Sequence, residues 1–274
     1  MHWILQTNLF NETEWDTLVS SLERFNVPYS VHKVIPFIGE LIPPATPSRD
    51  KVICFGSYSM RHTARANKWN PGVYDLFDVN FKVQHEHWGD DMLNADSIVT
   101  PFKDAVIDCP TFIRPIDDSK YFAGKVFEAD EWNKWRDSIC KDHEDYGNCL
   151  TPDTLVQLCK PKVIYAEYRY WIVNGEIVTK SRYKLGNRVT YSSDVDKHID
   201  YWVSGRTRGI EAIPRNPLPW LPKAFVIDVC DTPEGIKIVE LNTLNSSGLY
   251  AGNVADIVVA LETMENANEF YKGF

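Results

Sequence analysis

Two carboxylates on the facing strands of a predicted β-hairpin are the strongest sign of chemistry in this sequence. The segment Phe225–Asn242 consists of two apolar runs on either side of the turn Pro233-Glu234-Gly235. A three-residue loop with glycine at its left-handed position is a common hairpin connection. The register that this loop sets brings Asp228 directly opposite Glu240, with Asn242 one step further along the same face.

Such a pair of carboxylates needs a positive partner. Cross-strand side chains lie about 5 Å apart, and like charges at that distance repel each other. Both faces of the hairpin are mostly apolar, which favours burial and makes two uncompensated carboxylates costly. A divalent cation with oxygen ligands is the simplest compensation. The alternative is a hairpin at the solvent edge whose acidic residues face water.

A basic segment lies upstream of this hairpin. Between Lys160 and Arg188 the sequence has seven Lys or Arg and two Glu, whereas the whole chain has a net charge of −9. Lys180, Arg182 and Lys184 alternate along one predicted strand, so we expect their side chains to share one face. Three neighbouring cations favour an anion such as a polyphosphate, which a metal ion on the acidic hairpin would also bind. The alternative is a solvated strand edge, where lysines discourage aggregation.

Composition argues against several classes of function. The pI of about 5.3 disfavours duplex nucleic acid as the main partner, because binding to its backbone needs a basic surface. No apolar stretch approaches the length of about 18 residues that a membrane span needs, and no signal peptide is visible. The six cysteines form no CxxC pair, which favours free thiols in a reducing cytoplasm. The phosphate-binding patterns GxxxxGK[ST] and GxGxxG are absent from the sequence.

The elements that would position these residues fall into two parts. In the first part we expect strands at Trp3–Gln6, Tyr29–Ile35 and Lys51–Phe55, a helix over 12–25 with Asn11 and Glu14 as a capping box, and a helix from about Met60. This β-α-β pattern predicts a parallel sheet. Strands dominate the second part, and we place them at 111–114, 154–158, 163–173, 176–183, 188–191, 223–229 and 236–241, with helices starting near residues 130, 194 and 250. The pattern predicts an α/β (α+β) fold, with an N-terminal α/β domain over residues 1–105 and a mainly antiparallel β-sheet domain with flanking helices over residues 106–274.

In this order the motifs resemble the ATP-grasp superfamily. The sequence has a strand with a cation before proline at Phe112–Pro115, then a glycine-bearing loop, a Glu-x-Arg strand at Glu167–Arg169 and the Asp…Glu-x-Asn set of the hairpin. It is most similar to a clade defined by one arginine and two lysines, found in bacteria and their phages. The resemblance covers roughly residues 106–274 and implies an ATP-grasp fold, with residues 1–105 as the domain that precedes it.

The resemblance implies cationic contacts to the phosphates of ATP. Arg114 would contact the α- and β-phosphates, where a lysine is usual. Lys120 and Lys125 would belong to a mobile loop that closes over the phosphates. Lys180 and Arg182 would face the phosphates from the central hairpin.

The resemblance also implies contacts to the nucleoside and to metal. Glu167 would bind the ribose hydroxyls. The hinge whose backbone meets the adenine edge would contain Gln157, Leu158 and Cys159. One or two Mg²⁺ ions, with Mn²⁺ as an alternative, would bridge the β- and γ-phosphates on Asp228, Glu240 and Asn242. The backbone of Asn245–Gly248 would bind a substrate carboxylate or acyl-phosphate oxygen, and the turn Gly56–Arg61 would help to shape that pocket.

The sequence departs from the family pattern at Val226. Many ATP-grasp ligases have an arginine there, which steadies an acyl-phosphate intermediate. The candidates to replace it are Arg169, Arg206 and Arg208, and together with Lys180 and Arg182 they form the predicted catalytic set.

These roles predict an ATP- and Mg²⁺-dependent ligase that joins a carboxylate to an amine through an acyl phosphate and releases ADP. The partners would be ATP, a carboxylate and an amine, drawn from amino acids, peptides or protein ends. Two alternatives stay open. One is a phosphotransferase of the same fold with a non-carboxylate acceptor, which the missing arginine favours. The other is a nucleotide-binding module without catalysis.

Overall fold

The computed structural model describes residues 1–9, 14–36, 38–76, 79–117, 121–141, 150–208 and 221–270. The chain forms two compact units that alternate along the sequence. Unit 1 comprises Met1–Phe77, Tyr165–Asp231 and Glu240–Phe274, and unit 2 comprises Asp78–Ile164 and Thr232–Val239. These interleaved units show which segments pack together, but they do not test the predicted boundary between an N-terminal and a C-terminal domain near residue 105, which stays a prediction.

Unit 1 begins with a five-stranded sheet in the order β3-β2-β1-β4-β5. Its strands are β1 (His2–Gln6), β2 (Tyr29–Val34), β3 (Leu41–Ile42), β4 (Lys51–Phe55) and β5 (Asn70–Gly72). The neighbours β2-β1-β4-β5 pair in parallel, and β3 is antiparallel to β2. The connecting helices are α1 (Trp15–Arg24) and α2 (Met60–Ala66). The predicted parallel β-α-β arrangement is therefore confirmed.

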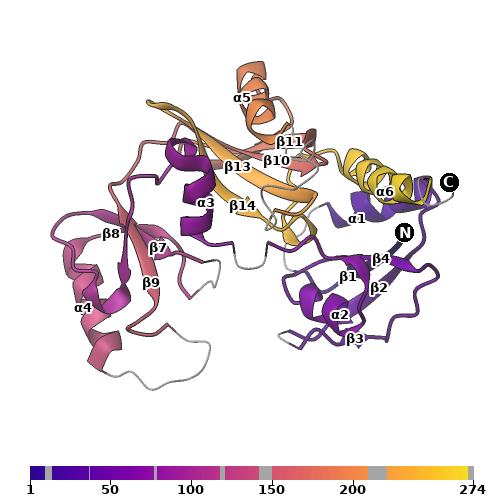
Figure 1. Cartoon of the computed structure of the whole chain (residues 1–274), viewed down its shortest axis with the longest axis horizontal. Coiled ribbons are helices and arrows are strands. Elements are labelled where there is room, and N and C mark those ends of the chain that lie inside the picture. The colour runs from indigo at the N-terminus through magenta and orange to yellow at the C-terminus, as the bar shows by residue number, and fades with distance from the viewer. Residues whose placement is uncertain are drawn as a thin grey trace. The chain divides into compact units, whose positions relative to one another are not determined.

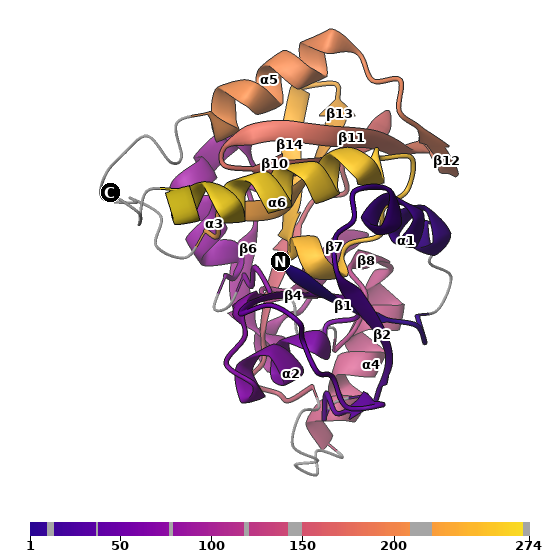
Figure 2. The same ribbon diagram turned by 90° about the vertical axis from the view of Figure 1, so that its right-hand side faces the viewer.

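The second sheet has the order β12-β11-β10-β13-β14. Its strands are β10 (Ala166–Val173), β11 (Glu176–Leu185), β12 (Arg188–Ser192), β13 (Ala224–Thr232) and β14 (Gly235–Asn242). The three pairings β10–β11, β10–β13 and β11–β12 are antiparallel. Two helices of unit 1, α5 (Lys197–Thr207) and α6 (Val254–Phe270), lie on opposite faces of this sheet, and a short 3₁₀ helix, η3 (Leu244–Ser246), follows β14 (Figure 2).

Unit 2 contains a four-stranded sheet in the order β6-β9-β7-β8. Its strands are β6 (Ile98–Pro101), β7 (Thr111–Pro115), β8 (Lys125–Phe127) and β9 (Leu155–Cys159). Its helices are α3 (Phe81–Trp88), α4 (Ala129–Lys141) and the 3₁₀ turns η1 (Gly89–Asp91) and η2 (Phe102–Asp104). Helix α4 lies beside the strands β7, β8 and β9 (Figure 1). Trp132 of α4 packs with Phe102, Ile113 and Val156 in the core of this unit. The mixed α/β architecture with antiparallel sheets agrees with the predicted fold class.

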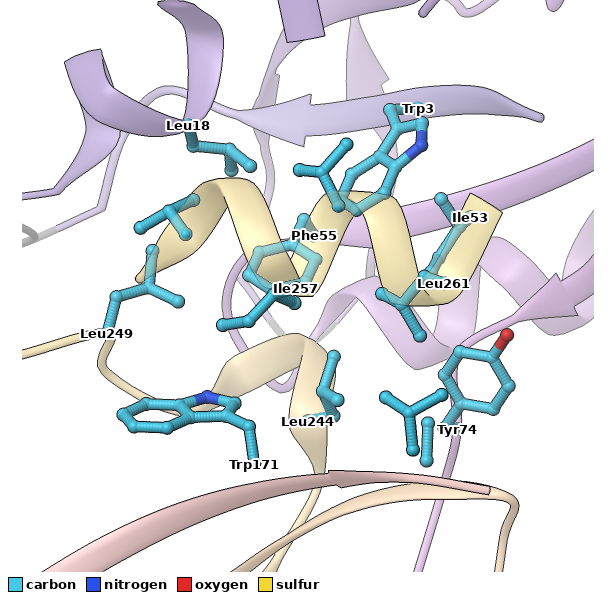
Figure 3. Packing of buried hydrophobic residues seen from close by; sticks show 14 of the residues in the cluster. Trp3, Leu18, Ile53, Phe55, Tyr74, Trp171, Leu244, Leu249, Ile257 and Leu261 are labelled. Carbon is cyan, nitrogen blue, oxygen red and sulfur yellow. The ribbon is translucent and has the colours of Figure 1, made fainter. Parts of the chain in front are cut away.

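The largest core of unit 1 joins its two sheets through α1 and α6. Trp3 and Phe55 of the first sheet and Trp171 of the second contribute the largest side chains, and Ile257 and Leu261 project from α6 between them (Figure 3). Trp3 also donates a hydrogen bond from its indole nitrogen to Glu262 at 2.7 Å. This packing fixes the loop between β14 and α6, which carries residues of interest for function. No helix of the described residues is both long and apolar enough to cross a membrane.

Several predicted boundaries differ from the structure. Helix α1 begins at Trp15 with Glu14 as its N-cap, so the capping box expected for Asn11 and Glu14 is wrong, and Asn11 itself lies outside the described residues. Helix α6 begins at Val254 rather than at 250, because Tyr250 has a φ of 49° and the Asn253 side chain accepts hydrogen bonds from the first turn. Strand β10 begins at Ala166 rather than at 163. The expected elements did not include α3, β5, β6 or β8.

Candidate active site

The centre of the candidate site is an ion pair between two neighbouring strands. Arg169 of β10 stands opposite Asp228 of β13. Its Nε donates to Oδ1 of Asp228 at 2.8 Å, and its Nη2 donates to Oδ2 at 2.7 Å. Asp228 is 1% exposed and Arg169 is 8% exposed. The positive partner that a buried Asp228 requires is therefore a bidentate guanidinium of the same sheet, which the sequence pattern does not reveal.

Electrostatics around this pair follow from its burial. Loss of hydration raises the pKa of Asp228 to about 6, against the charge and hydrogen bonds of Arg169, which lower it. The carboxylate is still ionised at neutral pH. Burial alone would lower the pKa of Arg169, but the Asp228 carboxylate raises it above its ordinary value, so the guanidinium is charged.

Asn242 joins the second carboxylate to this pair. Its Nδ2 donates to Oδ2 of Asp228 at 3.1 Å and to Oε1 of Glu240 at 3.2 Å. The structure thus brings together all three predicted metal ligands. Two carboxylates and one amide are oxygen donors that suit Mg²⁺, which keeps several waters and needs few protein ligands. To bind the cation, the amide would turn its oxygen toward it by a rotation of about 180°, which exchanges the positions of oxygen and nitrogen.

The donor set limits the kind of metal. Within the described residues, no group of three or more His, Cys, Asp and Glu side chains gathers as a metal site. A fully protein-coordinated Zn²⁺ or Ca²⁺ therefore has no support in that part of the chain, whereas a Mg²⁺ ion shared with substrate phosphates fits the set Asp228, Glu240 and Asn242.

The turn of the β13–β14 hairpin is close to the predicted one. Only Pro233 and Glu234 lie between the two strands, and Gly235 already belongs to β14 with a φ of 101°. Thr232 supports the turn, since its Oγ1 donates to the Gly235 carbonyl at 2.7 Å. Glycine is needed at this position because other residues are strained at such a φ.

Position 226, where many ATP-grasp ligases have an arginine, is a valine, and a guanidinium reaches Asp228 from the neighbouring strand. Val226 is fully buried in the core opposite Trp171. Among the three arginines considered as substitutes, Arg169 contacts Asp228. Arg206 stacks on Trp202 within α5, at 3.8 Å from Cζ to the ring centroid. Arg208 follows α5 and contacts Glu176 at 4.0 Å.

The alternating cations of β11 do not share one face. Lys180 pairs with Tyr170 across the sheet, and both side chains bind Asp200 of α5. Arg182 stands opposite Tyr168 on that same face, whereas Arg169 and Asp228 lie on the other. The two β11 cations of the predicted catalytic set are therefore on the opposite face of the sheet from the acidic residues.

A β-bulge explains why Lys184 differs. The register shifts between Glu167, which pairs with Lys184, and Tyr168, which pairs with Arg182, so Tyr183 is the extra residue. Lys184 thereby reaches Glu167 at 2.5 Å, and Tyr183 donates its hydroxyl proton to the same carboxylate at 2.8 Å. Burial raises the pKa of Tyr183, so the phenol stays neutral. The expectation that all three cations share one face is wrong for this reason.

Aromatic side chains border the Arg169 guanidinium. Tyr250 stacks on Tyr183 and on Tyr191, with ring centroids 5.3 and 4.9 Å apart. Arg169 lies over the Tyr250 ring at 4.7 Å. Tyr250 adopts a φ of 49°, which is strained for a residue other than glycine. No sequence pattern points to this residue, because its backbone conformation and its stacking partners depend on the fold.

The loop after β14 is fastened to the first sheet. The Asn245 side chain donates to the Cys54 carbonyl at 2.7 Å and accepts from the Tyr74 amide at 2.9 Å. Its own carbonyl accepts from the Gly56 amide at 2.9 Å. A cavity of about 240 Å³ is lined by this loop and by the turn after β4, including Gly56, Ser57 and 245–249. The structure thus brings together the two segments that were expected to shape a substrate pocket.

Arg169 reaches this loop as well. Its Nη1 donates to the Gly248 carbonyl at 3.3 Å. The ion pair with Asp228 and the cavity are therefore neighbours within unit 1.

In unit 2, Arg114 and Gln157 are cross-strand partners on β7 and β9. They lie on the face opposite to α4, because Val156 and Ile113 fill the α4 core. Gln157 is buried, and its Oε1 has no hydrogen-bond partner within the described residues. An unsatisfied buried amide of this kind is a candidate ligand contact.

The backbone of β9 is occupied where the hinge was expected. Gln157 and Leu158 pair with β6 on one side and with β7 on the other. Cys159 pairs with β7, and its Sγ is 3.2 Å from Oδ1 of Asn94. A strand paired on both edges has no backbone groups left for a base, so Gln157 and Leu158 do not offer the expected hinge.

Lys125 also differs from its predicted place. It begins β8 rather than belonging to a loop, and it stands opposite Ile113 on the α4 face. Its ammonium pairs with Glu131 of α4 at 2.9 Å and lies 4.5 Å from the Phe127 ring. Lys120 lies outside the described residues.

Known protein structures share this architecture. A RimK domain protein ATP-grasp from Sphaerobacter thermophilus DSM 20745 superposes with a TM-score of 0.62 at 12% identity, over 94% of this chain and 98% of that one. D-alanine–D-alanine ligase from Bacillus anthracis complexed with ATP superposes with a TM-score of 0.55 at 10% identity, over 97% of this chain and 98% of that one. At these identities the likeness concerns the fold alone.

Sequence comparison gives the family. No curated protein matches the chain. The model of an ATP-grasp domain family, the third of the clade named for one arginine and two lysines, matches residues 56–261. This range is well over half of the chain and includes Arg169, Asp228, Glu240 and Asn242. The chain therefore belongs to family 3 of the one-arginine, two-lysine clade of ATP-grasp proteins.

Proposed function

We propose that the protein is an ATP-dependent ligase that joins a carboxylic acid to an amine. The observation that supports this most is the cluster of Asp228, Glu240, Asn242 and Arg169 on one face of the second sheet, next to the 240 Å³ cavity. The cluster offers hard oxygen ligands for a cation and one guanidinium for a developing anion. Structural neighbours add an analogy, because one of them is a D-alanine–D-alanine ligase complexed with ATP.

The proposed reaction has two steps. A carboxylate oxygen attacks the γ-phosphorus of ATP, the bond from that phosphorus to the β,γ-bridging oxygen breaks, and an acyl phosphate and ADP form. The amine nitrogen then attacks the acyl carbon, phosphate leaves, and the nitrogen loses a proton to give the amide. Phosphoryl transfer of this kind depends mainly on positioning and on neutralising charge.

Within this scheme the residues of unit 1 have separate roles. Asp228, Glu240 and Asn242 would hold Mg²⁺, which when bound neutralises charge on the β- and γ-phosphates. Arg169, held by Asp228, keeps three further N–H groups beyond the two that bind this carboxylate. One of them binds the Gly248 carbonyl, and within the described residues the others donate no hydrogen bond, so we propose that they bind a developing anion. Preorganised donors of this type contribute a few kcal/mol each in acyl transfer.

For the nucleotide we propose a revised set of contacts. Arg114 remains a proposed phosphate contact and Glu167 a proposed ribose contact. Since β9 is paired on both edges, the adenine edge is assigned to the irregular segment 160–163 that follows this strand. Lys180 and Arg182 are left out, because they lie on the α5 face.

The phosphotransferase alternative loses its main support. It was favoured by the missing arginine at position 226, and Arg169 now places a guanidinium on Asp228. No other feature of the described residues favours a hydroxyl acceptor over a carboxylate.

The test is ADP release with a panel of carboxylic acids, in the presence of Mg²⁺ and hydroxylamine, which converts an acyl phosphate into a hydroxamate. We expect acid-dependent ADP and an equal amount of hydroxamate, both abolished by EDTA and in the Glu240→Gln variant. ADP without hydroxamate for every acid, together with a phosphorylated alcohol, would transfer the assignment to a kinase. ATP-dependent stabilisation with no turnover of any substrate would point to the binding module.

A further inference from the structure

The cavity beside the Arg169–Asp228 pair has an apolar wall. Five large apolar residues line it: Leu9, Trp15, Leu18, Phe55 and Leu249. Leu18 of α1, Phe55 of β4 and Leu249 of the loop after η3 converge in the main core, with Trp15 packed against it (Figure 3). The other described lining residues are glycine, serine and asparagine, so no charged side chain is among them.

The polar groups of the lining are mostly used within the protein. The Asn245 amide binds Cys54 and Tyr74. Ser247 donates its hydroxyl proton to the Thr243 carbonyl at 2.8 Å, and the Ser57 amide binds the Gln6 side chain at 2.8 Å. This side of the cavity therefore offers a ligand few hydrogen-bonding groups.

The hydrogen-bond donors that remain for a ligand are backbone groups of the loop after η3. Within the described residues, the backbone N–H groups of Gly248 and Leu249 donate no hydrogen bond. The Gly248 carbonyl is the group that binds Arg169. Two backbone amide donors in an otherwise apolar lining are the arrangement that suits a carboxylate with an apolar body.

We infer that this cavity binds the apolar group of the acid substrate, so that the substrate class is a carboxylic acid with a small, uncharged, hydrophobic body. The inference rests on the proposed ligase function. Such a group occurs in a free branched-chain or aromatic acid and in the C-terminal residue of a peptide, and both present the same chemistry to the cavity.

Charge and size exclude other acids. A second carboxylate or an ammonium group would lose its hydration among Leu18, Phe55 and Leu249 with no counter-charge in the described lining. The volume of about 240 Å³ equals that of roughly eight water molecules in the liquid. It falls below the lower end of the range for drug-sized ligands, roughly 300 Å³, so the space matches a single aliphatic or aromatic side chain.

Direct binding provides the first test. Calorimetry would compare acetate, butanoate and 4-methylpentanoate with the diacid glutarate, on the full chain with Mg²⁺ and a non-hydrolysable ATP analogue. Each added methylene should raise affinity about fourfold until the cavity is filled, and glutarate should bind no better than acetate. N-acetylglycylleucine and N-acetylglycylglutamate form a second arm, which distinguishes a peptide end from a free acid.

A charge inside the cavity provides the second test. Trp15→Arg should lower the affinity for 4-methylpentanoate at least tenfold and raise that for glutarate. The matched control is Tyr201→Arg on α5, where the side chain is 83% exposed and outside the cavity, and which should change neither. Thermal unfolding of both variants reports whether the fold is kept, and Trp15→Ala, which keeps the cavity uncharged, should shift the preference to longer acids.

The outcomes separate the two claims. Binding of apolar acids without ADP release or hydroxamate would support the apolar class and overturn the ligase assignment. ADP release that is equally fast with glutarate, or an unchanged preference in Trp15→Arg, would overturn the apolar class and leave the ligase assignment standing. Failure of all apolar acids and both peptides to bind would also overturn the apolar class.

Discussion

Arg169 and Asp228 face each other from neighbouring antiparallel strands and form two nearly parallel hydrogen bonds of 2.8 and 2.7 Å. Each is almost wholly buried, so each is the main compensation for the charge of the other. This relationship changes how any variant at the site must be interpreted, since an effect on activity and an effect on stability come from the same atoms.

The two acidic residues should respond differently to neutralisation. Asp228→Asn leaves a buried guanidinium without its partner, which costs about 3–5 kcal/mol of unfolding free energy. Glu240 is half-buried, and Glu240→Gln should cost about 1 kcal/mol or less. Both variants should release no ADP. Urea denaturation and an ADP assay measure the two effects, and normal ADP release by Glu240→Gln would remove this residue from the proposed metal site.

Replacement of the whole ion pair should separate stability from activity. Well-packed apolar residues often replace a buried ion pair at no cost, whereas removal of one partner is strongly destabilising. We expect Arg169→Met and Asp228→Leu each to destabilise the protein and the double variant to recover most of the loss. The double variant should remain inactive. A double-mutant cycle by denaturation gives the coupling, and additive losses would mean that the pair is not coupled as its geometry implies.

The two faces of β11 predict different effects on ATP binding. Lys180→Met and Arg182→Met remove cations from the α5 face and should leave the dissociation constant of ATP within about twofold. Lys184→Met removes the 2.5 Å partner of Glu167. Because Lys184 holds the Glu167 carboxylate that we propose as the ribose contact, this variant should weaken ATP binding more than the other two, by about tenfold or roughly 1.4 kcal/mol.

Calorimetry with a non-hydrolysable analogue would compare these three lysine and arginine variants. A larger loss of affinity for the analogue in Lys180→Met than in Lys184→Met would indicate that the phosphates bind on the α5 face. Thermal unfolding of each variant serves as the control, because the Lys180–Asp200 pair is partly exposed and should matter little for stability.

Tyr250 should contribute to stability in two opposite ways, because its aromatic stacking stabilises the fold and its backbone strain destabilises it. Tyr250→Ala loses the aromatic contacts, worth about 0.5–1.5 kcal/mol per ring pair, and the contact with Arg169. Tyr250→Gly loses the same contacts but relieves about 1 kcal/mol of left-handed strain. We expect the glycine variant to be the more stable of the two, and Tyr250→Phe to match the parent. A glycine variant less stable than the alanine one would mean that the φ of 49° is not strained.

Asn245 should be a structural residue of the substrate loop. Asn245→Ala leaves the Cys54 carbonyl and the Tyr74 amide without partners in a buried place, at about 1–3 kcal/mol each. Ser246→Ala, at the exposed neighbouring position, is the matched control and should be neutral. Denaturant midpoints measure both. Equal stability of the two variants would show that water replaces the lost bonds and that the loop is not fastened by this side chain.

The sequence was most informative where local patterns decide the structure. Two apolar runs around a glycine turn identified the β13–β14 hairpin, and the short strands with their intervening helices predicted the parallel first sheet. The spacing of Asp228, Glu240 and Asn242 was enough to expect them in one place, because residues two apart on a strand share a face.

The parts that could not be predicted depend on pairing between distant segments. Arg169 lies 59 residues before Asp228, and only the register of β10 against β13 makes them partners. The face of Lys184 was misjudged because a bulge leaves no recognisable mark in the sequence, and the face of Lys180 and Arg182 relative to Asp228 depends on the register of β11 against β10. Likewise, nothing in the residues of β9 says that both of its edges are paired, which is what moves the proposed adenine contact beyond the strand.

The bulge at Tyr183 has a further consequence for how this strand tolerates change. Side chains alternate between the two faces of a sheet along a strand. A bulge adds one residue, so every residue after it projects from the face opposite to the one that its sequence number suggests. Lys184 reaches Glu167 only because of this inversion. A deletion of Tyr183 would remove the bulge, and the lysine would then follow Arg182 directly and still stand opposite Glu167. The Glu167 carboxylate would keep its lysine and lose its phenol, which no substitution of Lys184 can achieve.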